Sequence, residues 1–238
     1  MPLCPFTATS SSSMKTPIPG GLIVAVEGID GAGKTTVAAS LAQWCGERGL
    51  ACVFSKEPTS LSYGQKLRES AKSGRLSIDE ELELFRLDRK EHVERSIAPA
   101  LAQDNIVILD RYYWSNAAYQ GACGADVEQI IVSNEGIAPV PDLILFMDVE
   151  VRSGIGRIHG RGDAPNDFEG LESLEKARAI FTALHKRQDR PSVRIDASQD
   201  LRAVCAEALR VFKDAACKKI MNASPVLLAE PARGEFFA

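Results

Sequence analysis

The sequence predicts an α/β fold in which five parallel strands form one sheet with helices on both faces. Three observations carry this prediction. Five short apolar runs recur along the chain, helical patterns lie between them, and a glycine-rich loop joins the first run to the first helix. Continuous apolar strands are typical of parallel sheets that are covered on both faces, and ligands then bind at the carboxyl ends of the strands.

The expected strands are short and bounded by polar or glycine-containing segments. They lie at residues 22–27, 51–56, 105–110, 142–148 and 192–196. Helical patterns are expected at residues 37–44, 79–102, 172–190 and 201–213. In the longest of them the spacing of apolar residues predicts an inward face formed by Leu82, Phe85, Val93, Ile97 and Leu101.

Length and composition predict one cytoplasmic domain with two tails. The chain has 238 residues, of which 45% are hydrophobic and 25% charged. Residues 1–20 are rich in Ser, Thr and Pro and are expected to be a disordered extension, residues 21–216 the folded domain, and residues 217–238 an irregular tail. The six cysteines show no spacing typical of a metal site, which favours reduced thiols in the cytoplasm.

Charge and hydropathy exclude two classes of protein. The formal net charge of −4 argues against a general nucleic-acid-binding protein, so any basic residues that bind anions should be concentrated locally. No apolar run reaches the length of a membrane helix.

The glycine-rich loop has the pattern G-x-x-x-x-G-K-T and follows directly on the first apolar run. Backbone N–H groups in such a loop converge with the helix N-terminus on one anionic site, which is the phosphate loop of P-loop NTPases. Lys34 would reach the β- and γ-phosphates of ATP, and the Thr35 hydroxyl would bind Mg²⁺. The residues expected to bind ATP here are Gly28, Ile29, Asp30, Gly31, Ala32, Gly33, Lys34, Thr35 and Thr36.

Polar side chains also follow the second and third strands. Lys56 and Glu57 place a cation and a carboxylate at one strand end, where they can hold a phosphate and orient a hydroxyl or Mg²⁺. Asp110 and Arg111 place a carboxylate beside a guanidinium at the next, for metal-bound water and for phosphate respectively. Small and amide side chains in residues 115–120 suit a pocket for a flat polar base.

With these motifs in order, residues 22–198 resemble the thymidylate kinase family. The resemblance implies a P-loop fold, transfer of the γ-phosphoryl group of ATP to dTMP, and a homodimer. The motifs that carry it are Glu27 to Thr36, Glu57-Pro58, Leu84-Phe85, Asp88-Arg89, Asp110-Arg111-Tyr112, Ala118-Tyr119-Gln120, Pro141-Asp142-Leu143 and Ile195-Asp196.

The resemblance also implies roles for substrate-binding residues. Phe85 stacks on thymine, and Arg89, one helical turn later, hydrogen-bonds the carbonyl edge of the base or braces the phosphate. Asn116 recognises the edge of thymine, Tyr119 crowds the 2′ position of the sugar, and Arg111 clamps the acceptor phosphate. The remaining residues expected at the substrate are Lys56, Glu57, Pro58, Ser115 and Gln120.

The catalytic set follows from the same resemblance. Asp30 approaches the sugar 3′-OH or the metal shell, and Asp110 holds Mg²⁺ through water. Because the phosphate loop has Ala32 where some members have arginine, a lid at about residues 153–170 must supply the cation. Arg157 and Arg161 are the candidates for this cation. Arg161 is the first choice, in which case Arg157 stacks on adenine. Asp196 completes the expected ATP-binding set.

Three departures from the family pattern bear on substrate and catalysis. Lys56 replaces an arginine, so a point charge stands in place of a bidentate fork. Asn166 and Asp167 replace an Asp-Arg pair in the lid, which removes a cation. Trp114 is a large residue next to the expected base pocket, where it either packs or shifts the substrate towards a modified pyrimidine.

Two other classes of function stay open at this point. A deoxynucleoside kinase would also have a phosphate loop, and would use Glu57 as the base for a sugar 5′-hydroxyl. A non-catalytic nucleotide-binding switch is the more distant alternative. Arg111, Lys56 and residues 115–120 favour a nucleoside monophosphate as the acceptor.

Overall fold

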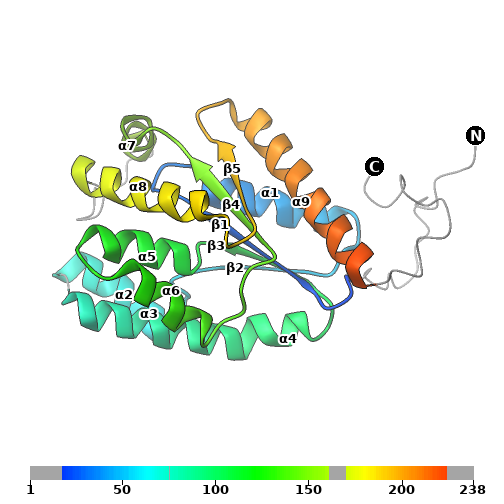
Figure 1. Cartoon of the computed structure of the whole chain (residues 1–238), viewed down its shortest axis with the longest axis horizontal. Coiled ribbons are helices and arrows are strands. Elements are labelled where there is room, and N and C mark those ends of the chain that lie inside the picture. Colours follow the sequence, from blue (N-terminus) through cyan, green and yellow to red (C-terminus); the bar gives the residue numbers. More distant parts are fainter. Residues whose placement is uncertain (1–17, 75, 161–169, 224–238) are drawn as a thin grey trace, which may run out of the picture.

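The computed structural model describes residues 18–74, 76–160 and 170–223, without the side chains of residues 72 and 73. Its strands form one parallel sheet in the order β2-β3-β1-β4-β5 (Figure 1), which confirms the predicted five-stranded α/β fold. The strands are β1 (Leu22–Glu27), β2 (Cys52–Lys56), β3 (Ile106–Asp110), β4 (Leu143–Asp148) and β5 (Ser192–Asp196).

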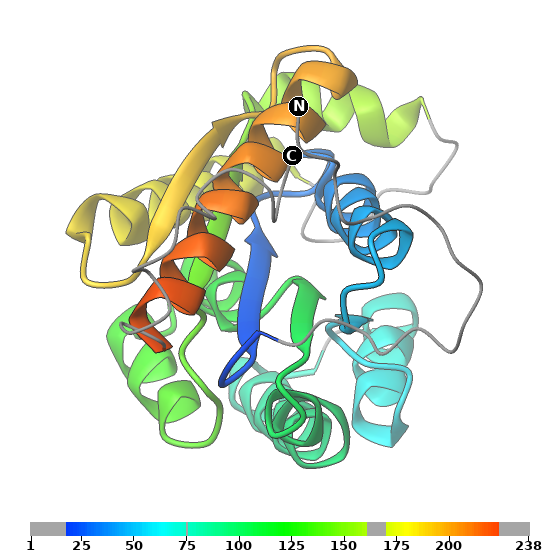
Figure 2. The ribbon, with the colours of Figure 1, turned by 90° about the vertical axis from the view of Figure 1, so that its right-hand side faces the viewer.

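Helices cover both faces of the sheet. Helices α1 and α9 contact each other and the strands on one face, whereas α4 and α8 contact strands on the other, with α5 packed on α8 (Figures 1 and 2). The helices are α1 (Lys34–Glu47), α2 (Ser62–Ser73), α3 (Ile78–His92), a π-helical turn η1 (Val93–Ile97), α4 (Ala98–Leu101), α5 (Tyr113–Ala122), α6 (Val127–Glu135), α7 (Val151–His159), α8 (Leu171–Arg187) and α9 (Leu201–Ala223).

The hydrophobic core lies along the three central strands. Every residue of β1, β3 and β4 is buried, as their continuous apolar sequences predict, whereas the edge strands β2 and β5 are only partly buried. Within the described residues, no helix is long and apolar enough to span a membrane.

The structure corrects both predicted domain boundaries. Residues 18–20 were expected in a disordered extension, but Ile18 is 1% exposed and its N–H donates to the Asp104 carbonyl at 2.9 Å. Residues 217–223 were expected in an irregular tail, but α9 continues through Ala223, and Lys219 Nζ lies 2.6 Å from Asp142 Oδ1. The predictions for residues 1–17 and 224–238, and for most of the lid at 161–169, lie outside the described residues.

The ends of β1, β2 and β3 meet at the phosphate loop. In the sheet register Asp110 is the partner of both Val26 and Lys56, so the loop after β1 lies beside the residues that follow β3. Gly31 has φ +78°, and a Cβ there would lie 2.2 Å from the Gly154 carbonyl oxygen of α7. A Cβ on Gly154 would in turn lie 2.8 Å from the Asp30 carbonyl oxygen, so α7 packs directly on the loop.

Ile18 was expected in the N-terminal extension, but its burial predicts that it contributes to the stability of the fold. Ile18→Ala should lower the free energy of unfolding by about 2–4 kcal/mol because the substitution leaves a cavity in the core. Urea denaturation followed by circular dichroism measures this change. The matched control is Val132→Ala, since Val132 is 61% exposed and should change stability little. Equal stability of the two variants would contradict the placement of Ile18.

Candidate active site

The phosphate loop begins at the end of β1 and continues into the first turn of α1. Gly33 is the N-cap of α1 and has the left-handed conformation, with φ +86°. Ile29 and Ala32 are buried against the core, which anchors the loop, while Thr35 and Thr36 are exposed at the helix N-terminus. The Lys34 ammonium donates to the Ile29 carbonyl at 2.6 Å, so the side chain folds back over the loop. In this geometry the loop N–H groups and the helix N-terminus can bind an anion.

Three charged side chains form a cluster beside the loop, here called the charge cluster: Asp30, Lys34 and Arg111. Arg111 Nη2 donates to Asp30 Oδ1, and Lys34 Nζ lies 3.8 Å from the same oxygen. Burial alone would raise the pKa of Asp30, but the charges of Arg111 and Lys34 more than offset it and hold that pKa well below its usual range. Burial and repulsion by Arg111 lower the pKa of Lys34 to about 7. An anion at the loop would restore the charge on Lys34.

Arg111 has a constrained backbone. Its φ is +74°, a conformation uncommon for residues other than glycine, and its N–H donates to the Val26 carbonyl at 3.0 Å. This turn directs the guanidinium back over the charge cluster, where Nη1 also lies 3.5 Å from the Ser115 hydroxyl. Backbone strain of this kind is maintained where the surrounding structure fixes it, and such residues concentrate at functional sites.

Thr35 and Asp110 together provide oxygen ligands suited to Mg²⁺. The Thr35 hydroxyl donates to Asp110 Oδ2 at 2.6 Å, and the other carboxylate oxygen, Oδ1, is buried with no hydrogen-bond partner among the described residues. The described residues contain no group of three or more His, Cys, Asp or Glu side chains that could hold a metal. Mg²⁺ commonly binds through one or two protein oxygens together with phosphates and water, so the residues present fit this ion.

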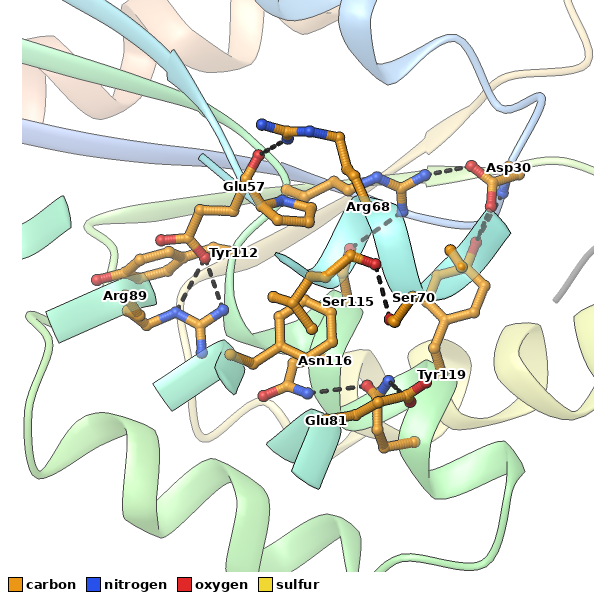
Figure 3. Close-up of a pocket in the computed structure, with 16 residues that line it drawn as sticks. Asp30, Glu57, Arg68, Ser70, Glu81, Arg89, Tyr112, Ser115, Asn116 and Tyr119 are labelled. Carbon is orange, nitrogen blue, oxygen red and sulfur yellow. Dashed lines mark hydrogen bonds and ion pairs between the residues drawn. The ribbon is translucent and has the colours of Figure 1, made fainter. Parts of the chain in front are cut away.

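Next to the charge cluster lies a cavity of about 200 Å³, here called the main cavity. Figure 3 shows side chains from the phosphate loop, the β2–α2 segment, α2, α3 and α5 around it. Its lining contains every residue predicted at the substrate except Lys56. The predicted residues that line it are Asp30, Glu57, Pro58, Phe85, Arg89, Arg111, Ser115, Asn116, Tyr119 and Gln120.

Glu57 is fixed at the base of the main cavity by two partners. Its Oε2 accepts from Arg89 Nε at 3.0 Å and Nη2 at 2.6 Å, and its Oε1 lies 2.9 Å from His92 Nδ1. Burial by itself raises the pKa of Glu57, but Arg89 and His92 lower it below the ordinary value. The Arg89 guanidinium also lies over the Tyr112 ring, 5.3 Å from its centroid. Arg89 is therefore held in one orientation while it lines the cavity.

A chain of buried amides fixes the hydrogen-bonding groups that α5 presents to the main cavity. Asn134 Nδ2 lies 3.4 Å from Asn116 Oδ1, Asn116 Nδ2 donates to Gln120 Oε1 at 2.8 Å, and Gln120 Nε2 donates to Glu81 at 3.2 Å. Asn134 Oδ1 also accepts from Arg89 Nη1. Because each amide is constrained by the next, the wall presents donors and acceptors in a defined pattern, as recognition of a flat polar base requires.

Tyr119 connects the main cavity to the phosphate loop. Its hydroxyl donates to Asp30 Oδ2 at 2.8 Å and accepts from the Asp30 N–H at 2.9 Å. The position of Asp30 is therefore set from α5 as well as by Arg111. A phosphate-binding site and a base-sized cavity thus share one wall.

The remaining predicted ATP-binding residues lie at the ends of α7 and β5. Arg157 Nη2 donates to the Ala197 carbonyl at 2.9 Å and Nη1 lies 3.4 Å from the Gly31 carbonyl, so its side chain spans from the β5–α9 connection to the phosphate loop. Asp196 accepts from the Ser198 N–H and hydroxyl at that connection. Arg161 and the changed pair Asn166-Asp167 lie outside the described residues.

Two expectations about individual residues change with the structure. Lys56 does not line the main cavity in the described structure; its ammonium lies 3.2 Å from Asp110 Oδ2, beside the Thr35 hydroxyl. The positive charge of Lys56 therefore acts on Asp110, the candidate metal ligand. Trp114 is 2% exposed in the hydrophobic core and is not among the residues around the cavity, so packing is the interpretation that holds.

Sequence reasoning missed several residues of the site. Arg68 and Leu67 line the main cavity from α2. This helix was not predicted, because its sequence shows no helical repeat of apolar residues. Glu81, His92 and Asn134 act through buried hydrogen bonds rather than through a motif. The one signal available for Glu81 was its position one helical turn before Phe85 on the same predicted helix.

The fold and the site define a P-loop kinase that acts on a nucleotide. The sequence model of one family, thymidylate kinase, matches residues 26–208. A thymidylate kinase of Xanthomonas campestris pv. campestris (strain B100) is 47% identical over 92% of this chain and 95% of its own length. Thymidylate kinases of Xanthomonas euvesicatoria pv. vesicatoria (strain 85-10) and Xylella fastidiosa (strain M12) are 50% and 47% identical over 80% and 81% of this chain, and over 82% and 87% of their own lengths. The chain belongs to the thymidylate kinase family.

Glu27, at the end of β1, gives a pH dependence that can be tested. It is fully buried and accepts from the Tyr112 N–H at 2.9 Å and the Ser115 N–H at 3.1 Å. Burial raises its pKa from 4.5 to about 7 although Ser115 and Arg111 oppose the change. The folded protein therefore binds more protons than the unfolded chain between these values, so the stabilising contribution is present below pH 4.5 and is lost as the pH rises through about 7.

We expect Glu27→Gln to remove this dependence. Between pH 4.5 and 8 the wild type should lose on the order of 1–3 kcal/mol of unfolding free energy relative to the variant, because glutamine has the same shape and does not titrate. Urea denaturation at a series of pH values measures both profiles. Other titrating groups cancel in the difference, so parallel profiles would show that Glu27 does not titrate in this range.

Proposed function

We propose that this chain transfers the γ-phosphoryl group of ATP to dTMP, giving ADP and dTDP. The observation that carries the proposal is that Asp30 belongs to the phosphate loop and also lines the main cavity, where Arg111 and Tyr119 hold it. Donor and acceptor phosphates can therefore meet at one charge cluster. Family membership supplies the identity of the two substrates.

On the donor side, the phosphate loop and Lys34 would bind the phosphates of ATP. Backbone N–H groups of the loop and the N-terminus of α1 supply positive potential. Because they are already in place, the protein does not have to rearrange during the reaction. Lys34, with its pKa lowered to about 7 in the structure, gains its proton fully when a phosphate replaces the Ile29 carbonyl as its partner. Arg157 would contact ATP from α7, and a lid arginine, Arg161, would complete the charge neutralisation.

On the acceptor side, the main cavity would take thymine and its sugar. Phe85 lines the cavity from α3 and would stack on the base, while the fixed amide of Asn116 would read its edge. Arg111 would exchange part of its contact with Asp30 for the acceptor phosphate. Phosphoryl transfer asks the protein mainly to align two phosphates and to neutralise charge, which is what these residues are arranged to do.

Mg²⁺ would be held by the Thr35 hydroxyl and, through water, by Asp110. When bound, the ion would supply positive charge to the transferring phosphoryl group and fix its orientation. The buried, unpartnered Asp110 Oδ1 and the hydrogen bond from Thr35 to Asp110 support this assignment. Lys56, 3.2 Å from Asp110, would tune the same carboxylate electrostatically.

The state of Glu57 argues against the nucleoside kinase alternative. A general base for a 5′-hydroxyl must be free to accept a proton, whereas both oxygens of Glu57 have partners in Arg89 and His92. These partners lower its pKa, which makes Glu57 a weaker base. We propose that Glu57 instead orients Arg89 towards the substrate. Membership of the family further supports a cytoplasmic homodimer.

The first test is the choice of acceptor. Purified protein with ATP and Mg²⁺ should produce ADP with dTMP far faster than with dUMP, dCMP, dGMP or thymidine, as measured by coupled ADP detection. Turnover of thymidine alone would make Glu57 a base and the protein a nucleoside kinase. A preference for another pyrimidine monophosphate would move the assignment to a modified substrate, and no turnover with any acceptor would refute the proposal.

The charge cluster predicts the effect of two substitutions. Lys34→Ala and Arg111→Ala should each lower kcat by on the order of 10³-fold, because a cation is lost from the transferring phosphates. Arg210→Ala is the matched control, since Arg210 is an exposed arginine on α9 that pairs only locally with Glu207 and Asp214 in the described structure. Thermal unfolding of all three should confirm that they fold. Activity near the wild-type value for Lys34→Ala or Arg111→Ala would overturn the site assignment.

A further inference from the structure

A second cavity adjoins the main cavity, and Pro58 and Arg68 form part of the wall of both. This basic cleft has a volume of about 410 Å³ and lies between the segment after β2 and the end of α3 with the turn η1. Its lining contains the cations Lys56, Arg68 and Arg95, and no carboxylate among the described residues. Neither the phosphate-binding residues of the loop nor Phe85 belong to it.

The cations of the basic cleft are only partly compensated. Lys56 lies 3.2 Å from Asp110. Arg95 lies 2.9 Å from the partly buried Glu91, but its own side chain is 67% exposed, so solvent weakens this pair. Arg68 donates to two neutral groups, the carbonyls of Pro58 and Thr59. Serine hydroxyls from both sides of the cleft, such as those of Ser55 and Ser96, add hydrogen-bonding capacity. The lining therefore has the composition of an anion-binding site.

His92 provides an independent sign of a missing ligand. Its side chain is 3% exposed and lines the basic cleft. Its Nδ1 forms a hydrogen bond of 2.9 Å with Glu57 Oε1. The other ring nitrogen, Nε2, is buried with no hydrogen-bond partner in the described part of the chain. A buried polar atom that loses its contact with water and gains no partner is destabilising, so native structures rarely leave one without a ligand or water. Nε2 is therefore available to form a hydrogen bond with a phosphate ligand in the cleft.

The helix geometry at this point is also unusual. Directly after His92 the chain forms the π-helical turn η1, in which the Ala98 N–H donates to the Val93 carbonyl. Arg95 and Ser96 both lie in this turn and both line the cleft. Single π-helical turns within a helix occur frequently at functional sites, because they change which side chains share a face.

We propose that the basic cleft binds a multiply charged phosphate compound, at a site separate from those for ATP and dTMP. Lys56, Arg68 and Arg95 supply the charge, and His92 with the serine hydroxyls supplies hydrogen bonds. The volume, about twice that of the main cavity, gives room for more than one phosphate group. Because Pro58 and Arg68 belong to both cavities, a ligand here lies directly behind the acceptor wall.

Titration calorimetry with inorganic diphosphate as the probe tests the proposal. The protein is first saturated with ADP and dTMP, which occupy the phosphate loop and the main cavity. Wild-type protein should then bind diphosphate at one further site. The double variant Arg95→Ala/Ser96→Ala should bind it roughly tenfold more weakly, because a charge-assisted hydrogen bond and a hydroxyl are lost. Neither residue lines the main cavity.

The matched control is Arg86→Ala. Arg86 is a partly exposed arginine on the same helix as His92. It pairs with Glu83 three residues earlier, as Arg95 pairs with Glu91 four residues earlier. It does not line the basic cleft. Affinity for diphosphate should be unchanged in this variant, and both variants should retain wild-type turnover of dTMP. Absence of binding to the wild type, equal affinity in the double variant, or an equal loss in Arg86→Ala would each overturn the proposal.

Discussion

The site depends on one constraint, which is that charges buried at the carboxyl edge of the sheet must neutralise one another. Asp30, Lys34 and Arg111 come from the phosphate loop, the start of α1 and the end of β3. The charges of Arg111 and Lys34 keep Asp30 ionised, and Asp30 in turn favours the charged forms of both cations. A buried charge without a partner lowers the stability of the fold, so the charge cluster fixes the relative positions of the three segments. The register that pairs Val26 with Asp110 is what brings them together.

Much of the fold could be predicted because its signals are local. The bounds of β1 and β5 are those predicted, and the bounds of the other strands were predicted within one residue, since continuous apolar runs need no knowledge of neighbours. Helices α2 and α5 were not predicted. Residues 113–120 of α5 are buried on all sides and show no polar face, whereas Leu67 is the only apolar side chain described as fully buried in α2. Ile18, between two prolines, gave no periodic signal at all.

In the candidate site, too, local signals could be predicted and long-range contacts could not. Residues within motifs, such as Lys34 and Arg111, were predicted because their chemistry depends on neighbours in the sequence. Asn134 and His92 were not, since each contributes through a buried hydrogen bond to a residue far away in the chain. Lys56 was placed at the end of β2 as predicted, but its ion pair with Asp110 was not, because the sequence cannot show that Asp110 lies opposite it in the sheet.

The close approach of Gly31 and Gly154 has a consequence for how this sequence can diverge. Neither position has room for a Cβ, because each would meet the other segment's backbone, and Gly31 also needs a positive φ. A side chain at either position would force α7 away from the phosphate loop and carry Arg157 with it, away from the Gly31 carbonyl. We therefore expect both positions to stay glycine in related proteins whose α7 packs on the phosphate loop in this way.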